Sequence, residues 1–577
     1  MNPLVKKFKN YMRNKRDPVT IGRTDEPVGM YSRMILSENI SMLTDPRIIN
    51  RNLNTILFGD DESIIASYIG PNLMQGGRSF VVMDPDGLIS GRYARYLEYK
   101  GYRVRRLDFI HTDRSSRYNP FSYVSSDREI ADLVISAINS MPHGGDEDRP
   151  FTKMAENSLL TAVFMYVCYC EKEENRNISF AADLLEREAS YLDTHDTAKG
   201  GKCTGGSNMC ELNTGSPLDE IFTSLEENDP ESPAVRQYRI FRIAVGRKLR
   251  KEATGSCAKS LRIFTAGEIA DIMCADDMDL DRIGDEMTAV FVSAPKECTA
   301  FSPVVNMFFT QFFRNMVDYC ENRAEFTQIV TDSWGNIIKC FRADKDSIKE
   351  AAKEAEGFLK RAKEGKVLFN EAAERYEVVT SHNELVCFRG SKKDALEAFE
   401  SVKGGKVIGR DCPGWTRTPP VQTMVMLAGF PRLCRIWEFD MLIAILRKWG
   451  IIVSIATESL AQLQAAYGDE SRWADIIGNC GTVIISGGEC DSVTAKFVSK
   501  WIISTKTCRR RRKYMAGTPA REIPVPEGCT PDVLQKIPKR ERIIAIRGTK
   551  PLIDRKYDET SHPEWDTVVR CQNAGFS

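Results

Sequence analysis

Short, continuous apolar runs alternate with helical periodicity near the start of the chain, between residues 50 and 124. Runs without a polar alternation are typical of parallel strands that are buried on both faces. The expected elements of this part are, in order, the strands Thr55–Phe58, Ser79–Met83 and Arg103–Leu107, with a helix at Ile89–Lys100 before the last strand.

The same pattern returns between residues 421 and 504. It predicts strands at Thr423–Leu427, Ile451–Ile455 and Thr482–Ile485, helices at Trp437–Trp449 and Leu460–Tyr467, and a last apolar strand at Ile543–Ile546. Strands that alternate with helices indicate an α/β fold with a mainly parallel sheet.

Between residues 125 and 285 the apolar positions change to a purely helical period, which predicts an all-α insertion. The expected helices are Arg128–Ser140, Phe151–Glu171, Ile178–Glu188, Pro233–Lys251 and Gly255–Phe264. Sheet character resumes at Thr288–Ser293, and an apolar helix follows at Val304–Cys320.

A small α+β insertion is expected between residues 341 and 410. Its helix Ser347–Lys363 alternates charge at helical spacing and is predicted to be solvated. Two short strands and a further helix follow, at Arg375–Thr380, Glu384–Arg389 and Lys392–Val402. The chain is thus divided into residues 1–34, 35–124, 125–285, 286–340, 341–410 and 411–577.

The stretch Asn54–Leu73 has the strand–glycine–helix frame with which P-loop proteins hold nucleotide phosphates. Counted back from Pro71, the positions of the phosphate-binding lysine and the magnesium-binding hydroxyl hold Ile64 and Ile65. The whole degenerate loop reads Gly59, Asp60, Asp61, Glu62, Ser63, Ile64, Ile65.

Three consecutive carboxylates in this loop oppose a phosphate. A like-charge contact at 4 Å costs roughly 4 kcal/mol at an effective dielectric constant near 20, which is about a thousandfold in affinity. The loop is therefore not expected to bind ATP tightly. This interpretation depends on Ile64 and Ile65 facing the pocket and on no lysine from elsewhere pointing into it.

The second half of a P-loop site is an apolar strand that ends in acidic residues for Mg²⁺ and water. The candidate strand here is Thr423–Leu427, and it runs into Ala428 and Gly429 without a carboxylate. Both halves of the expected nucleotide site have lost their charged groups.

Composition limits the other classes of function. Lys and Arg number 80 and Asp and Glu number 80, so no overall field favours nucleic acid or membrane. The 17 cysteines are dispersed, as in reduced cytosolic proteins, and the chain is expected to be cytoplasmic. Cys203 and Cys210 near His195 lie in a glycine-rich loop, and no metal site is proposed. No apolar run reaches the about 20 residues that span a bilayer.

Two basic segments each leave two interpretations open. Residues 1–24 interleave lysine and arginine with apolar residues, which suits either a helix lying on anionic lipid at the inner face of the membrane or a solvated tail. A second run could contact nucleic-acid phosphates or form a solvated loop. It consists of Arg509, Arg510, Arg511, Arg512 and Lys513.

Several stretches resemble the TraG/TraD-type coupling proteins of type IV secretion and conjugation. They cover most of residues 35–565 in the family's order: Ile35–Asn39, Asn52–Gly59, Gly70–Gln75, Val82–Pro85, Arg117–Phe121, Arg149–Phe151, Asp279–Phe291, Ile445–Leu463, Gly478–Cys480, Ile546–Pro551 and Lys556–Asp558. The resemblance implies a RecA-like P-loop NTPase fold. Active relatives are membrane-anchored hexameric ATPases that use ATP and Mg²⁺ and pass DNA–protein substrates to the secretion channel.

This chain departs from the family at its charged positions. The phosphate-loop lysine and threonine fall on Ile64 and Ile65, and the strand-terminal acidic pair falls on Ala428 and Gly429. A lysine after the second strand becomes Asp86, a Gln-Ser pair becomes Glu458-Ser459, and the family's paired transmembrane helices are absent.

The resemblance and the departures together predict a coupling-protein homologue without ATPase activity and without a nucleotide cofactor. Its helical part, Arg128–Ala270, would recruit a relaxase or DNA–protein substrate, and the chain would join type IV secretion components, including an active paralogue in a mixed ring. Two alternatives remain: an active DNA-translocating ATPase with a non-standard site, in which Glu458 supplies the acid, and a DNA-binding accessory subunit.

Overall fold

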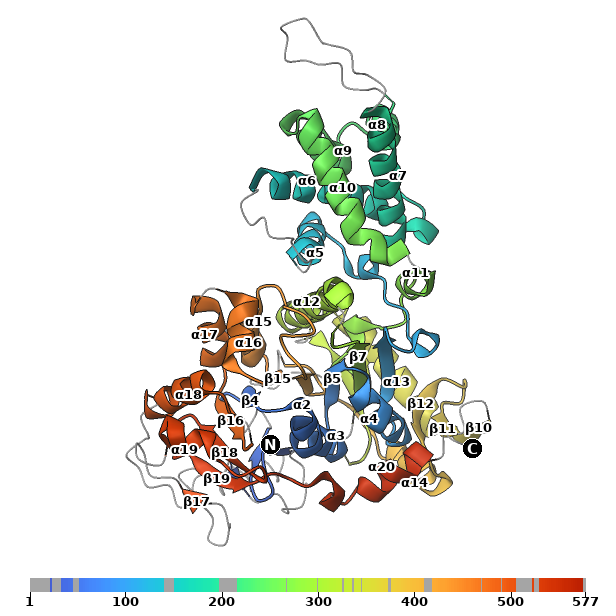
Figure 1. Cartoon of the computed structure of the whole chain (residues 1–577). Coiled ribbons are helices and arrows are strands. Elements are labelled where there is room, and N and C mark those ends of the chain that lie inside the picture. Colours follow the sequence, from blue (N-terminus) through green and yellow to red (C-terminus); the bar gives the residue numbers. More distant parts are fainter. Residues whose placement is uncertain are drawn as a thin grey trace, which may run out of the picture.

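The computed structural model describes residues 21–22, 33–44, 51–139, 150–196, 215–265, 267–297, 299–323, 326–334, 337–343, 345–371, 375–408, 418–468, 470–488, 490–504, 521–522 and 529–573. A ten-stranded sheet with the order β17-β19-β18-β16-β4-β15-β14-β5-β7-β6 forms its centre (Figure 1). From β16 to β6 neighbouring strands are parallel, and β18, β19 and β17 continue the sheet antiparallel.

The strands of this sheet are β4 (Thr55–Phe58), β5 (Ser79–Pro85), β6 (Arg103–Asp108), β7 (Thr288–Ala294), β14 (Thr423–Leu427), β15 (Ile452–Thr457), β16 (Thr482–Ser486), β17 (Arg521–Glu522), β18 (Glu541–Ile546) and β19 (Leu552–Arg555). Every residue of β4, β5, β7, β14, β15 and β16 is buried. The mainly parallel α/β sheet predicted from the continuous apolar runs is confirmed.

Successive side chains of each central strand enter different apolar clusters. In β4, Ile56 and Phe58 join one cluster and Leu57 joins the other. The helices that cover the sheet are α4 (Leu88–Tyr99), α12 (Ser302–Asp318), α15 (Phe439–Lys448), α16 (Leu460–Tyr467), α17 (Glu470–Gly478), α18 (Ser492–Ser504), α19 (Pro531–Gln535) and α20 (Trp565–Asn573). The sheet is therefore covered on both faces, as a parallel sheet requires.

A helical lobe projects from the sheet between β6 and β7 (Figure 1). It contains α5 (Asp127–Asn139), α6 (Pro150–Tyr169), α7 (Ile178–Asp196), α8 (Pro217–Asn228), α9 (Pro233–Ala244), α10 (Arg247–Leu261) and α11 (Gly267–Met273). The expected helices Pro233–Lys251 and Gly255–Phe264 are wrong in their bounds. The chain turns extended at Val245 and Gly246, and Gly255 lies inside α10.

The lobe encloses a buried ion network. Arg250 on α10 donates to Glu188 on α7 at 2.7 Å and to Asp219 on α8 at 3.1 Å. It also contacts the hydroxyl of Tyr238 on α9 at 3.1 Å. Glu188 is fully buried and Asp219 nearly so, and the network thereby joins four helices.

The small α+β part contains β8 (Gln328–Thr331), β9 (Ile337–Phe341), α13 (Ile348–Lys363), β10 (Lys366–Asn370), β11 (Arg375–Val379), β12 (Leu385–Arg389), α14 (Lys392–Lys403) and β13 (Lys406–Ile408). The expectation that the first helix is solvated is wrong. Its alanines and the pair Phe358 and Leu359 form a buried stripe against the strands, because the charges occupy only the other face.

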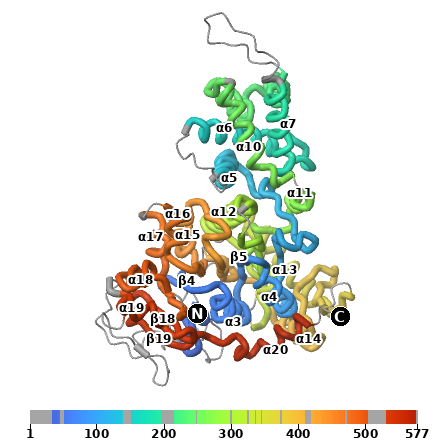
Figure 2. The backbone as a smooth tube through the Cα atoms, in the orientation of Figure 1, coloured from blue at the N-terminus to red at the C-terminus, as the bar shows by residue number. Residues whose placement is uncertain are grey.

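A three-stranded antiparallel sheet with the order β1-β3-β2 packs behind the loop that follows β4. Its strands are β1 (Ile21–Gly22), β2 (Arg33–Ile35) and β3 (Ser41–Leu43). Figure 2 shows these blue strands beside the red strands β18 and β19. Asn72 exchanges two hydrogen bonds of 2.9 Å with the backbone of Ile35. Arg542 of β18 donates to Leu36 O at 2.9 Å, and Asp554 of β19 accepts from Ser37 Oγ at 2.6 Å.

The helical run after β4 is irregular: α2 (Asp61–Ile64), a π-helix (Ile65–Ile69) and α3 (Gly70–Gln75) follow one another. Pro71 has no N–H with which to bond the carbonyl of Ser67. Arg542 contacts that carbonyl at 3.4 Å instead, and burial lowers its pKa to about 10. None of the described helices is both long and apolar enough to cross a membrane.

Candidate functional site

The carboxyl ends of the parallel strands bring the two expected halves of the nucleotide site together, since β15 alone lies between β4 and β14. Gly59 follows β4, and its N–H donates to Thr457 O of β15 at 3.1 Å. A Cβ on Gly59 would lie 2.6 Å from Cβ of Ser486 on β16, so only glycine fits.

A carboxylate of the chain itself occupies the start of the first helix. Asp60 is extended, and its Oδ1 accepts from Ser63 N at 2.8 Å, as an N-cap does. A helix N-terminus carries partial positive charge and unpaired N–H groups, which is why P-loops place phosphate there. In this chain the Asp60 side chain supplies that negative charge.

Ile64 and Ile65 do not line the pocket. They are 0% and 4% exposed and pack with Leu57 and Tyr68 in the apolar cluster behind the sheet. The expectation that they face the pocket is therefore wrong, because a buried helix must turn its apolar side chains to the core. The presence of isoleucine at these two positions therefore says nothing about whether the loop binds nucleotide. That question depends on the loop carboxylates and the side chains that pair with them.

Two lysines that are distant in sequence approach the loop, so the expectation that no lysine from elsewhere points into it is wrong as well. Both conditions set by the sequence interpretation fail, and the case against nucleotide binding depends on the loop carboxylates alone. Lys296, just after β7, lies 2.5 Å from Asp61 Oδ2 and 3.6 Å from Glu458 Oε1. Lys556, after β19, donates to Ser63 Oγ at 2.7 Å and to Gly487 O at 3.0 Å. Burial lowers the pKa of Lys556. Burial is the largest single effect on Lys296 too and lowers its pKa, but the hydrogen bond and the charge of Asp61, together with the charge of Glu458, raise the pKa overall.

At the end of β14, the second half of the expected nucleotide site, the space around the chain is closely packed. Ala428 is buried, and a Cβ on Gly429 would lie 3.3 Å from Pro85 and 3.9 Å from Asp61 Oδ2. Arg432, three residues on, pairs with Glu458. Three carboxylates (Asp60, Asp61, Glu458) and three cations (Lys296, Arg432, Lys556) thus gather at this edge, and four of these six side chains pair with one another.

Two further acidic residues at this edge, Asp84 and Asp86, accept hydrogen bonds from backbone N–H groups of the chain. Asp84 is fully buried and accepts from the backbone N–H groups of Ile89 and Ser90 at 2.8 Å each, at the start of α4. Burial raises the pKa of Asp84 to about 6. Asp86, where the family has lysine, accepts from Lys296 N at 2.9 Å and so positions the residue that pairs with Asp61.

Lys296 could have been found from sequence, because it directly follows a predicted strand at the edge where all parallel strands end. Lys556 lies in one of the stretches that resemble the family, Lys556–Asp558, but strand order alone does not place it at the loop, since it arrives from an antiparallel extension of the sheet. The basic run 509–513, the segment 1–20 and the cysteines at 203 and 210 lie outside the described residues. Among the residues that the structure describes, no group of three or more His, Cys, Asp or Glu is placed to hold a metal ion.

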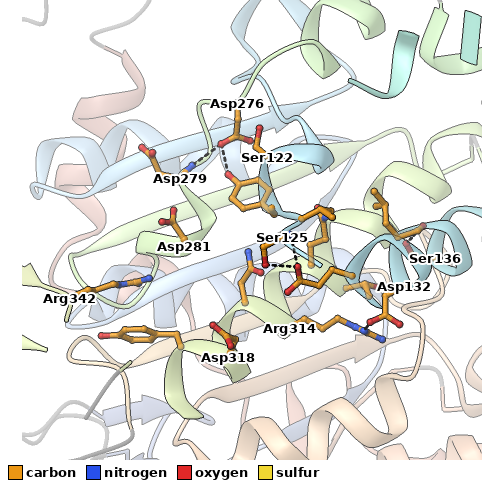
Figure 3. Close-up of a pocket in the computed structure, with 18 residues that line it drawn as sticks. Ser122, Ser125, Asp132, Ser136, Asp276, Asp279, Asp281, Arg314, Asp318 and Arg342 are labelled. Atoms are coloured by element: carbon orange, nitrogen blue, oxygen red, sulfur yellow. Dashed lines mark hydrogen bonds and ion pairs between the residues drawn. The ribbon is translucent and has the colours of Figure 1, made fainter. Parts of the chain in front are cut away.

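A second concave region lies between the helical lobe and the sheet, a cavity of about 350 Å³ between α5 and α12 (Figure 3). Acidic side chains dominate its lining: Glu129, Asp132, Asp276, Asp279, Asp281 and Asp318, with Arg314 and Arg342. Most of them are engaged within the chain. Arg314 pairs with Asp132 and with Glu438 of α15, and Glu129 accepts from Ser125.

Comparisons with known proteins give a consistent result. The family model described as type IV secretory system conjugative DNA transfer matches residues 65–331, and the model described as the TraM recognition site of TraD and TraG matches residues 422–523. No curated protein matches the chain.

Solved structures of a bacterial conjugative coupling protein, TrwB, share the fold. Its unbound form lacking an N-terminal segment is 10% identical, with a TM-score of 0.51 over 93% of this chain and 94% of that one. Its complex with ADP and Mg²⁺ is 11% identical over 93% and 94%, also with a TM-score of 0.51. The RecA-like P-loop NTPase fold predicted from the sequence is therefore confirmed.

Proposed function

Because this chain belongs to the TraG/TraD-type coupling proteins of type IV conjugative DNA transfer, we propose that it serves that process by binding, without hydrolysing ATP. It keeps the sheet and the helical lobe of the family. It would recruit a relaxase or DNA–protein substrate through the helical lobe and contact other type IV secretion components, including an active paralogue in a mixed ring.

One observation carries this proposal: the loop that would hold phosphate is closed by its own carboxylate. Asp60 caps the helix, Asp61 is held by Lys296, and Glu458 is held by Lys296 and Arg432. A nucleotide would have to displace Asp60 and then sit beside the unneutralised Glu62, which is exposed at the same loop. TrwB binds ADP and Mg²⁺ in its solved complex; for this chain we propose that no nucleotide is needed.

The direct test uses the purified full chain. We expect no thermal shift and no phosphate release with Mg²⁺-ATP, while deletion of the gene lowers transfer of the element that carries it. Co-purification from cells that carry the whole element should recover type IV secretion components. Nucleotide-dependent stabilisation with turnover would contradict the binding-only role, and undiminished transfer after deletion would contradict the role in conjugation.

A second function, an ATPase with an unusual site, is favoured by the two lysines at the loop. If Asp60 and Asp61 rotated away, Lys556 and Lys296 could meet phosphate oxygens, and Glu458 at the end of β15 could act as the acid. In that case hydrolysis would be measurable and would be lost in Lys556→Ala and Lys296→Ala. The matched control is Lys448→Ala, an exposed lysine on α15.

A role as a DNA-binding accessory subunit rests on the run 509–513. Phosphate contacts release counterions, so such binding would weaken steeply with salt. A gel-shift titration of the full chain against a variant in which the run is neutralised tests this role.

Residues 1–24 interleave basic and apolar residues, which suggests contact with a membrane surface. Binding of this segment to anionic vesicles tests that contact.

A further inference from the structure

The two most exposed large apolar side chains among the described residues both lie in the helical lobe. They are Ile243 on α9, 81% exposed, and Phe151 on α6, 76% exposed. Met154 and Ile240 on the same two helices are 59% and 54% exposed. Single exposed apolar residues need no explanation, but a group of this kind marks an interaction surface.

The four residues lie on two helices that pack against each other. Helices α6 and α9 lie side by side, and Cys170 just after α6 hydrogen bonds to Ser232 just before α9. The two helices are therefore antiparallel. The last turns of α9, with Ile240 and Ile243, lie toward the end of α6 that carries Phe151 and Met154. We call these four residues the lobe patch.

The outward stripe of α9 combines this apolar end with positive charge. Arg236, Arg239, Ile240, Ile243 and Ala244 are exposed at helical spacing, whereas Tyr238 and Phe241 face the core. Arg239 pairs with Glu226 and remains half exposed. The stripe itself contains no acidic residue. Its charge and its apolar side chains are complementary to a segment that carries carboxylates beside apolar anchors.

We propose that the lobe patch docks an acidic amphipathic helix of a protein partner. Such helices insert apolar residues spaced i, i+3, i+4 and i+7, which suits a patch built on two antiparallel helices. Nucleic acid is disfavoured because Phe151 is the only aromatic member of the patch and the aromatic residues of α9 are buried, so successive bases find no stacking platform. A membrane is disfavoured because α9 offers two apolar residues, not the broad apolar face of an interfacial helix.

This inference rests on the proposed function in assigning the partner to the transfer machinery, and its test is independent of it. The probes are two synthetic helical peptides with the same leucine spacing, one with glutamate and one with lysine at the polar positions. Binding to the full chain is measured by fluorescence anisotropy. We expect the glutamate peptide to bind about tenfold more tightly or better, and the preference to shrink with salt.

Substitutions in the lobe patch test whether the glutamate peptide binds there. Ile240→Glu with Ile243→Glu should weaken the glutamate peptide by about tenfold or more, and Phe151→Glu should act in the same direction. Leu396→Glu on α14, 47% exposed, is the matched control and should leave binding unchanged. Because all of these side chains are exposed, the melting temperature should stay the same. If a variant unfolds, replacement by alanine tests the same contact.

Three results would overturn the inference. The first is equal affinity for the two peptides, and the second is a glutamate-peptide affinity that the patch variants leave unchanged. The third is binding of duplex DNA or of phosphatidylglycerol-containing vesicles that depends on the patch while the glutamate peptide does not bind. If the peptide result fails but gene deletion still lowers transfer, the proposed function stands and the patch alone is rejected.

Discussion

Two ion networks in this molecule use the same residue types in different surroundings. In the helical lobe, Arg250, Glu188 and Asp219 are buried between four helices, and each charge has a partner on another helix. At the sheet edge, Lys296, Asp61 and Glu458 lie at the loop that follows β4, where Glu458 and Lys296 keep partial contact with water.

The difference teaches what each network does. A buried ion pair gains little over an apolar replacement but is severely destabilising when one partner is removed. A partly exposed pair contributes about 1 kcal/mol or less. The lobe network therefore fixes the arrangement of its helices, whereas the edge network can be rearranged at small cost to the fold.

The largest effect is expected for Arg250→Met. It leaves Glu188 and Asp219 buried without their main cation and should lower the free energy of unfolding by roughly 3–5 kcal/mol. Denaturant unfolding measures it. The triple variant Arg250→Met, Glu188→Leu, Asp219→Leu should recover much of the loss, because neither buried carboxylate remains and the other cation that pairs with Asp219, Arg242, keeps partial contact with water. A loss below about 1 kcal/mol for the single variant would erase the contrast between the networks.

A smaller effect comes from Asp84, the buried acid at the sheet edge. Its pKa of about 6 in the fold exceeds the ordinary value of 3.8, so the stability it contributes is full below about pH 4 and is lost as the pH rises through 6. Asp84→Asn does not titrate. Its destabilisation relative to the natural chain should therefore be larger at low pH than at neutral pH, by up to roughly 2–3 kcal/mol.

Paired denaturant titrations at about pH 4.5 and 7.5 measure this difference. A destabilisation that is the same at both values would mean that Asp84 is ionised throughout. Asp84 would then be ionised over this pH range like an exposed carboxylate, despite its burial.

Asp60→Ala removes the cap of the first helix and should lower stability by about 1 kcal/mol. It also frees the helix N-terminus and takes one negative charge from the loop, so added phosphate should stabilise the variant more than the natural chain. Glu62→Ala removes the same charge from an exposed neighbour and keeps the cap. If Glu62→Ala responds to phosphate as strongly as Asp60→Ala, the cap is not what closes the loop.

The smallest effect is expected for Lys296→Met. Asp61 loses its cation, but water reaches the rim, so stability should fall by about 1 kcal/mol or less. Thermal melts at low and high salt measure it, and the difference from the natural chain should shrink with salt. A loss as large as that of Arg250→Met would show that the edge network holds the fold.

The sheet was predictable because its strands are uninterrupted apolar runs, and Thr55–Phe58 and Thr423–Leu427 have their expected bounds. The break between α9 and α10 has a visible signal in Gly246, which the apolar period of the region concealed. The buried face of α13 is built largely of alanines, which a charge pattern does not reveal. Local signals cannot show which side chains meet across the sheet.

The sequence predicted where the candidate site lies, but not which side chains meet there. The strand–glycine–helix frame located Gly59 and Gly429, and parallel strand ends brought them together. The partners of the loop acids, Lys296 and Lys556, come from strands far away in sequence. Counting loop positions also misjudged Ile64, because the irregular helix turns it into the core.

The segment that joins β2 and β3 is linked to the π-helix by a single side chain. The guanidinium of Arg542 donates hydrogen bonds to the carbonyl of Leu36 in that segment and to the carbonyl of Ser67 in the π-helix. Arg542 therefore connects the β2–β3 segment both to the π-helix and to strand β18 of the central sheet. A truncation that removed residues up to 44 would take Leu36 from this fully buried guanidinium and leave it only Ser67 as an acceptor, so shortened versions of this protein should begin ahead of Arg33.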